Sequence, residues 1–327
     1  MVGVAEPDFP DSIACSGPPL SRSDELEGRQ NFLTRSDKPV PMNLWLVLAG
    51  NSIAFGGLLF LLSAGFSLIF GLMRIPNLTH GSLFMLGAYF GTSLIAAGFG
   101  FWPAAITAGI GVAIFGGLIE RLLLRRLPGA ELAQVLVTLG LSFMIADLCL
   151  MGWGGDPIEI ATPPALRGAT RIATVAFPTY RLAVIAVAVI IAAGLWALLD
   201  RTRLGAMIRA GVDDPAMARV VGIRVSRLFT IVFCLGAGLA GFAGVIGGPI
   251  LSVYPGLDQD MLPLALVVVI LGGSGSLVGS FVGSFVVGFL YNFGQAMLPE
   301  LAYVVLFLPM LIVLVLRPQG LFGRAAP

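Results

Sequence analysis

The chain holds few residues that could act as catalysts or metal ligands. His80 is its only histidine, and Cys15, Cys149 and Cys234 lie far apart in the sequence. Metal sites and nucleophilic centres need several such groups at defined spacings. The sequence therefore indicates no catalytic residue, no metal site and no cofactor bound by this chain.

A glycine-rich stretch, GGSGSLVGSFVGSFVVG, runs over residues 272–288. Glycine-rich loops can cradle phosphates, but this one has no lysine and no Ser/Thr pair after it, which argues against a Walker A loop. Three of its glycines instead recur every four residues, which predicts one helical face that a second helix can approach closely. These are Gly275, Gly279 and Gly283.

The composition indicates that the protein lies in a membrane. It is 57% hydrophobic and 11% charged, with a mean hydropathy of +0.96. A soluble globular domain carries about 25% charged residues, so this chain could not cover a water-exposed surface. Its net charge of +1 gives no indication of nucleic-acid binding. The lipid bilayer is the expected solvent.

Uncharged runs predict the membrane crossings, since a helix needs about 20 apolar residues to cross about 30 Å of hydrocarbon. Single crossings are expected at 44–70, 132–153, 182–199, 228–248 and 301–316, and up to two each within 81–119 and 261–299. The piece 261–271 would rise only about 16 Å, so a broken or re-entrant helix is expected there. The fold class predicted is an all-α polytopic membrane protein with about eight or nine transmembrane helices, in one membrane domain over residues 42–323.

The first 41 residues differ from the rest. They contain six prolines and many charges, with no apolar periodicity and no secretory signal pattern. A disordered tail is the first expectation for residues 1–41. Because Met42 stands directly before the first crossing, a translation start at Met42 is the alternative.

Arginines predict the orientation of the loops. Three lie within 121–126 and six within 201–227, whereas 98–103 and 248–260 contain neither Lys nor Arg. By the positive-inside rule the first two segments are cytoplasmic and the last two face outward. The outer segment 154–180 is rich in prolines and glycines, which predicts a cap of turns rather than another crossing.

The cytoplasmic loop 200–227 contains the pattern of a short helix, DDPAMARVVG. Asp214 can cap the first amides, Pro215 suits the first helical position, and Gly222 can end the helix in the left-handed conformation. A second short helix is expected at 203–210. Exposed apolar residues ringed by charge favour a docking surface for a soluble partner over a simple solvated loop.

Several interruptions of the apolar pattern are candidates for a pathway or gate across the membrane. A carboxylate in mid-bilayer costs about 2.5–3.5 kcal/mol on insertion scales, so Asp147 needs a partner, a hydrated vestibule or another subunit. Irregular backbone in a membrane needs protein or water to satisfy it, so each break could be a gate or a structural feature. The candidates are Asn77, His80, Gly81, Asp147, Gly272, Gly273 and Gly275.

Several stretches together resemble the LivH-type permease subunits of bacterial ABC importers for branched-chain amino acids. They are NLTHGSLFMLGAY, LGAMIRAGVDDPAMARVVGI, AGLAGFAGVI, LGGSGSLVGSFVG and RPQGLFG, and the resemblance covers residues 43–323. The positions that match the coupling loop of that family are Gly205, Arg209, Ala210, Asp214, Pro215, Ala218 and Gly222.

The resemblance implies a transport subunit of the bacterial inner membrane, not an enzyme. Its expected partners are a second, LivM-like membrane subunit, two cytoplasmic ATPase subunits that hydrolyse ATP, and a periplasmic substrate-binding protein. The short helix would sit in an ATPase cleft with Ala218 at a tight contact. A permease for urea or short amides is an alternative, as is a self-sufficient secondary transporter or channel.

Overall fold

The computed structural model describes residues 42–323 apart from 74–76, 173–174, 274 and 318. The described residues from Trp45 onward belong to one structural unit. The predicted disordered tail, residues 1–41, lies outside the described residues, so the tail and the alternative start at Met42 stay predictions.

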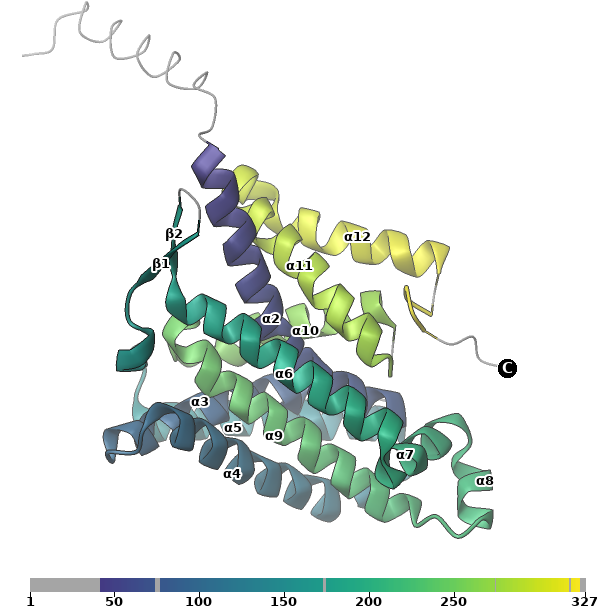
Figure 1. Ribbon diagram of the computed structural model, residues 1–327. Helices are drawn as coiled ribbons and strands as arrows, with labels where there is room; N and C mark the ends of the chain where they lie inside the picture. Colours follow the sequence, from purple (N-terminus) through teal and green to yellow (C-terminus); the bar gives the residue numbers. More distant parts are fainter. Residues whose placement is uncertain (1–41, 74–76, 173–174, 274, 318, 324–327) are drawn as a thin grey trace, which may run out of the picture. The chain divides into compact units, whose positions relative to one another are not determined.

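Helices form nearly all of the described chain (Figure 1), which confirms the predicted fold class. The α-helices are α2 (Met42–Met73), α3 (Thr79–Ala96), α4 (Phe101–Leu122), α5 (Glu131–Trp153), α6 (Thr179–Arg201), α7 (Arg203–Asp213), α8 (Pro215–Val220), α9 (Val225–Leu251), α10 (Leu257–Gly272), α11 (Leu277–Met297) and α12 (Ala302–Leu316). The segment between α5 and α6, called the outer segment after its predicted side of the membrane, contains a 3-10 turn (Pro164–Leu166) and an antiparallel hairpin of β1 (Ala169–Ile172) and β2 (Val175–Pro178).

Seven of the described helices are long and apolar enough to cross a membrane: α2, α4, α5, α6, α9, α11 and α12, the last taken with its preceding 3-10 turn. Helices α3 and α10, with 18 and 16 residues, are not among these seven, so the total of eight or nine crossings stays a prediction. Helix α10 begins earlier than predicted, after Gly256 in the left-handed conformation. Its 16 residues rise about 24 Å at 1.5 Å each, still short of about 30 Å of hydrocarbon.

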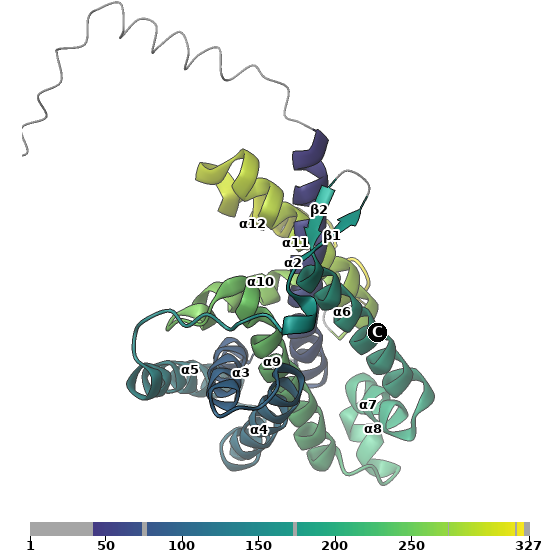
Figure 2. The same cartoon turned by 60° about the vertical axis from the view of Figure 1, so that its left-hand side comes forward.

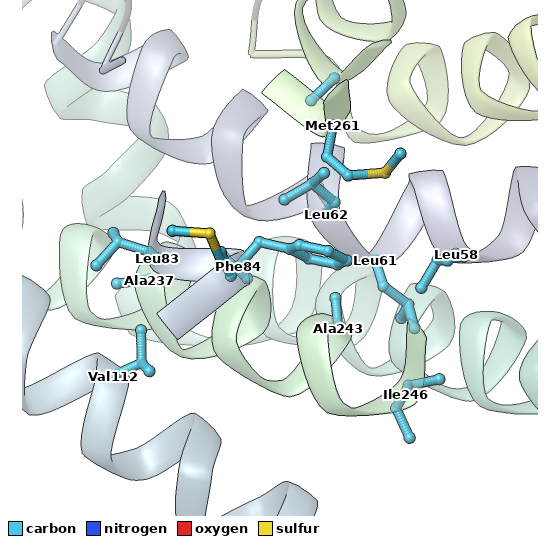
Figure 3. Packing of buried hydrophobic residues seen from close by; sticks show 14 of the residues in the cluster. Leu58, Leu61, Leu62, Leu83, Phe84, Val112, Ala237, Ala243, Ile246 and Met261 are labelled. Atoms are coloured by element: carbon cyan, nitrogen blue, oxygen red, sulfur yellow. The ribbon is translucent and has the colours of Figure 1, made fainter. Parts of the chain in front are cut away.

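Helix α2 is the most deeply buried of the spanning helices. Its leucines pack against α3, α9 and α10 in one apolar cluster (Figure 3), which includes Leu58, Leu61, Leu62, Leu83, Phe84, Ala243, Ile246 and Met261. This contact explains why the first apolar run has no polar face: lipid covers little of it. Helices α4, α5, α6 and α12, by contrast, keep exposed apolar faces.

Glycines bring α3 and α9 into backbone contact. A Cβ atom added to Gly244 would lie 2.0 Å from the carbonyl oxygen of Phe84, and one added to Gly87 would lie 2.3 Å from the Cα of Gly241. Side chains at these points would push the helices apart, as expected for small residues at membrane helix interfaces. The stretch AGLAGFAGVI in α9 is therefore a packing surface.

Two contacts define the ends of the helical bundle. At one end the hydroxyl of Thr230 donates to Oε2 of Glu120 at 2.6 Å, so the end of α4 adjoins the start of α9. The two arginine-rich segments, which follow α4 and precede α9, therefore share this end. At the other end Ile158 and Val253 exchange backbone hydrogen bonds of 2.8 and 2.9 Å, which join two segments that the sequence predicts to face outward.

The predicted glycine face of α11 needs one correction. Gly279 and Gly283 do lie at close helix contacts, since Cβ atoms there would be 2.0 Å from the Gly272 oxygen and 3.0 Å from the Val268 oxygen. Gly275, however, precedes the N-cap Ser276 and has φ of +77°. It is part of the turn before α11 and contacts Gly71 of α2. The four-residue spacing predicted a helix one turn too long, because the turn needs glycine for its backbone conformation.

Candidate functional site

The first turn of α7 requires glycine where it lies against the end of α6. A Cβ atom at Gly205 would lie 2.0 Å from the carbonyl oxygen of Leu199, so a larger residue would force the two helices apart. The hydroxyl of Thr202 accepts a 3.1 Å hydrogen bond from the Gly205 amide and caps α7. The Arg209 guanidinium donates to the Leu199 carbonyl and lies 3.1 Å from the Asp200 carboxylate. These contacts fix the direction in which α7 leaves the bundle.

Helix α8 has the caps that its sequence predicts. Oδ1 of Asp214 accepts hydrogen bonds from the amides of Ala216 and Met217, both at 2.9 Å. At the other end Gly222 has φ of +88°, and the amide of Ile223 donates to the Ala218 carbonyl at 2.9 Å. Ala210 takes part through its carbonyl, which accepts from the Asp214 amide at 3.1 Å and joins α7 to α8. A six-residue helix is marginal alone, so these caps stabilise it.

The exposed face of α8 differs from the expectation for Ala218. That side chain is 2% exposed and faces this chain's own helices, so it cannot form the predicted tight contact with an ATPase. Packing of α8 on α7 and α9 sets this direction. The side chains that point away are Met217, Val220 and Val221, with exposed fractions of 59%, 81% and 69%. These three residues form the apolar face of α8 (Figure 1 shows the helix beyond the ends of α6 and α9).

A buried polar seam joins α3, α5 and α10. Oδ2 of Asp258 accepts a 2.8 Å hydrogen bond from the Ser82 hydroxyl, which lies 2.8 Å from the hydroxyl of Ser142. Asp258 is 3% exposed, and its Oδ1 has no hydrogen-bond partner among the described residues. Ser142 is the central residue of the 23-residue α5, so this carboxylate lies beside the middle of a spanning helix.

Sequence reasoning missed Asp258 because 248–260 was interpreted as an outer loop. The turn Tyr254-Pro255-Gly256 is followed by two acidic residues, which is a typical signal for the start of a helix. This signal could have placed Asp258 in the first turn of a helix. Even that signal would not have identified the two serines, which are 176 and 116 residues away.

Replacing Asp258 with Ala should lower the stability of the permease in detergent. The Ser82 hydroxyl would lose its 2.8 Å hydrogen bond to the Asp258 carboxylate and keep only its contacts with Ser142. A hydrogen bond to a charged group typically contributes about 1.5–3 kcal/mol. Asp258→Asn keeps an acceptor and should cost less. Asp156→Ala is the matched control, because it removes the same carboxylate at an exposed position. Thermal unfolding of the purified variants measures the effect, and equal midpoints for Asp258→Ala and Asp156→Ala would contradict a stabilising role.

The break before α3 is tied to its neighbours. Oδ1 of Asn77 accepts from the Thr79 amide at 3.2 Å, and the Thr79 hydroxyl donates to the Thr138 carbonyl at 3.0 Å. The Nε2 of His80 lies 3.0 Å from the Leu62 carbonyl oxygen, and a Cβ at Gly81 would be 2.7 Å from the Asp258 carbonyl oxygen. Asn77, His80 and Gly81 are all buried. Their burial favours the interpretation of this break as a structural feature over an open gate.

The second candidate break is covered by the C-terminal segment. The amides of Leu321 and Phe322 donate to the carbonyls of Leu271 and Gly272 at 2.9 and 3.1 Å. A Cβ at Gly273 would lie 2.4 Å from the Gly323 amide nitrogen. Leu321 and Phe322 thus satisfy the backbone at the end of α10, as irregular backbone in a membrane requires. In this structure Gly272 and Gly273 contact protein rather than an open channel.

Asp147 lies apart from both breaks, on the exposed side of α5. The structure therefore brings His80 beside Leu62 and Gly81 beside Asp258, and Asn77 caps the same break through the Thr79 amide. It places Asp147 and the glycines of the α10–α11 turn elsewhere.

Membrane-crossing helices around a buried polar seam, with a capped helix beyond one end, define a polytopic membrane protein. The family model described as branched-chain amino acid transport system, permease component, matches residues 48–314. The chain belongs to this family and is a transport subunit.

Individual relatives agree with this assignment. The high-affinity branched-chain amino acid transport system permease protein BraD of Pseudomonas aeruginosa is 28% identical over 84% of this chain and 94% of its own length. LivH of Escherichia coli, with the same description, is 26% identical over the same shares. The fructose import permease protein FrcC of Rhizobium meliloti is 28% identical over 78% of this chain and 77% of its own. No solved structure matches at a comparable level of significance.

Proposed function

We propose that this chain is one of two membrane subunits of an ATP-driven importer in a bacterial inner membrane. A second, LivM-like membrane subunit, two cytoplasmic ATPase subunits and a periplasmic binding protein complete the transporter. The ATPases hydrolyse ATP, and their closure moves α8 and the helices attached to it. Membrane helices then alternate between outward-open and inward-open arrangements.

The apolar face of α8 is the observation that carries this proposal. Exposure of Met217, Val220 and Val221 to water is unfavourable, and such an exposed apolar surface typically marks a binding site for another protein. Thr202, Gly205 and Arg209 fix α7, and α7 contacts both α8 and α9. A displacement of α8 by a soluble partner would therefore be transmitted to α6 and α9 through packed helices rather than lost in a flexible loop.

The proposed substrate is a branched-chain or related amino acid. Support comes from the family description and from BraD and LivH, while FrcC is named for fructose. The experiment reconstitutes the purified complex in proteoliposomes and measures ATP-dependent uptake of leucine, isoleucine, valine, urea and fructose. Calorimetry on the copurified binding protein identifies its ligand independently. Uptake of leucine, isoleucine or valine supports the proposal, and uptake of only urea or fructose contradicts this substrate class.

The proposed orientation predicts opposite labelling of the two ends of the bundle. Single cysteines at Arg224 and Ala169, both exposed, are introduced after Cys15, Cys149 and Cys234 are replaced by serine. A membrane-impermeant maleimide added to intact spheroplasts should label the cysteine at 169, in the outer hairpin, and not the one at 224. Labelling of both after membrane disruption is the control. External labelling at 224 alone would show that the orientation is inverted.

A further inference from the structure

Asp147 is unusual among the charged residues of the spanning helices. In the described helices α2, α4, α5, α6, α9, α11 and α12 it is the only Asp, Glu, Lys or Arg more than four residues from a helix end. It lies six residues before Trp153, or about 9 Å below the end of α5. Its side chain is exposed on the surface of this chain.

The exposed face of α5 combines apolar side chains with Asp147 and a glycine. Leu132, Leu136, Met144 and Met151 have exposed fractions of 73%, 58%, 61% and 83% and repeat at helical spacing. Gly140 lies on the same face, two turns from Asp147, and a Cβ there would meet nothing within 4 Å. We call these six residues the α5 stripe.

Helix α5 has little protein around it. Its main packing partner is α3, and the polar seam adds the contact of Ser142 with Asp258. Figure 2 shows α5 at the left margin of the helices, with α3 between it and α9. The stripe faces away from these partners.

Contact with lipid is unfavourable for the α5 stripe. The outer face of α4 provides the comparison, since its exposed Ile106, Ile110, Ile114 and Leu118 include no polar group and suit hydrocarbon. The α5 stripe instead presents a carboxylate, which lipid does not solvate, and a glycine, which allows another backbone to come close. Both features are typical of contacts between membrane helices.

We propose that the α5 stripe binds a transmembrane helix of the second membrane subunit, and that this helix supplies a hydrogen-bond donor or a positive charge to Asp147. The inference rests on the proposed function, which requires such a subunit. A second copy of this chain fits less well. Two copies in the same membrane orientation, related by a two-fold axis beside α5, would place their Asp147 side chains at the same depth and bring like charges together.

Photo-crosslinking tests the position of the partner. Benzoylphenylalanine is placed at Met144 or Met151 in the α5 stripe, and at Ile110 or Ile114 on α4 as matched controls, in cells that express the complete transporter. The α5 sites should yield adducts with the second membrane subunit, and the α4 sites should not. Adducts from α4 alone, adducts that join two copies of this chain, or no protein adduct from α5 would overturn the proposal.

Charge substitution tests the role of Asp147. Asp147→Lys should reduce copurification of the second membrane subunit at least tenfold, whereas Asp147→Asn, which keeps a hydrogen-bonding group, should reduce it less. Asp156→Lys makes the same change at an exposed position of the outer segment and should leave copurification unchanged. Unchanged copurification with Asp147→Lys contradicts the proposal. If the wild type copurifies with no second membrane subunit, the proposed function fails with it; if it does but α5 gives no adduct, only this inference fails.

Discussion

Uptake should fall at least tenfold when Val220 and Val221 are both replaced by glutamate, with an unchanged amount of permease in the membrane. Both side chains are exposed in the free subunit, at 81% and 69%, so the charges themselves should cost little folding stability. In an ATPase cleft they would become buried carboxylates without partners. Interface residues of this kind contribute about 2 kcal/mol or more, which corresponds to roughly a thirtyfold loss of affinity.

The measurement is ATP-dependent uptake in cells, together with copurification of the ATPase subunits. A control with glutamate at Ala165 and Ala169, exposed positions of the outer segment, adds the same charge away from α8 and should leave both readouts unchanged. Ala218→Glu should behave differently from the double variant. Its buried position means that the permease itself should be less abundant. Normal uptake and normal ATPase association in the Val220/Val221 variant would support a simple solvated loop.

The second large effect is expected at the contact between α3 and α9. Gly244→Val should reduce the amount of folded permease at least tenfold, because the new Cβ would lie 2.0 Å from the Phe84 oxygen and 2.9 Å from the Ala88 nitrogen. Both are backbone atoms, so no side-chain rotation relieves the clash. Overpacking of a well-packed core typically costs about 1–3 kcal/mol, and separating two helices should cost at least the upper end of that range.

Gly194→Val in α6 is the matched control for this substitution. A Cβ at Gly194 would meet nothing within 4 Å, so the added side chain has room at the surface. Membrane levels by immunoblot and unfolding midpoints in detergent measure both variants. Equal levels of the two proteins would show that α3 and α9 are not held in the backbone contact described above.

Features that depend on neighbouring residues in the sequence could be predicted. The crossings follow from uncharged runs, and the α8 caps follow from Asp214, Pro215 and Gly222 within nine residues. Hydrocarbon thickness and orphan amides at helix starts act locally, so one stretch of sequence contains the whole signal. The same holds for the outer segment, where prolines and glycines predicted turns and a hairpin and turn were found.

Features that depend on distant residues could not be predicted. Asp258 has a buried role only because α3 and α5 bring Ser82 and Ser142 beside it. Ala218 was assigned to the partner contact because it is small, but packing on α7 and α9 turns it inward. Gly275 was assigned to a helical face by spacing, although its backbone conformation places it in the preceding turn. In each case the folded structure, not the local sequence pattern, decides what the residue contacts.

Crosslinking from α8 to an ATPase subunit tests whether α8 is the docking helix. A benzoylphenylalanine at Val221, in membranes containing the complete transporter, should form an adduct with an ATPase subunit. The same probe at Ile106, on the outer face of α4, should not. The Val221 adduct should depend on an intact α8. Asp214→Ala removes the cap and about 0.5–2 kcal/mol of helix stability, so this change should weaken the adduct. A transporter that imports its substrate normally but gives no ATPase adduct from Val221 would contradict the assignment of α8 as the docking helix.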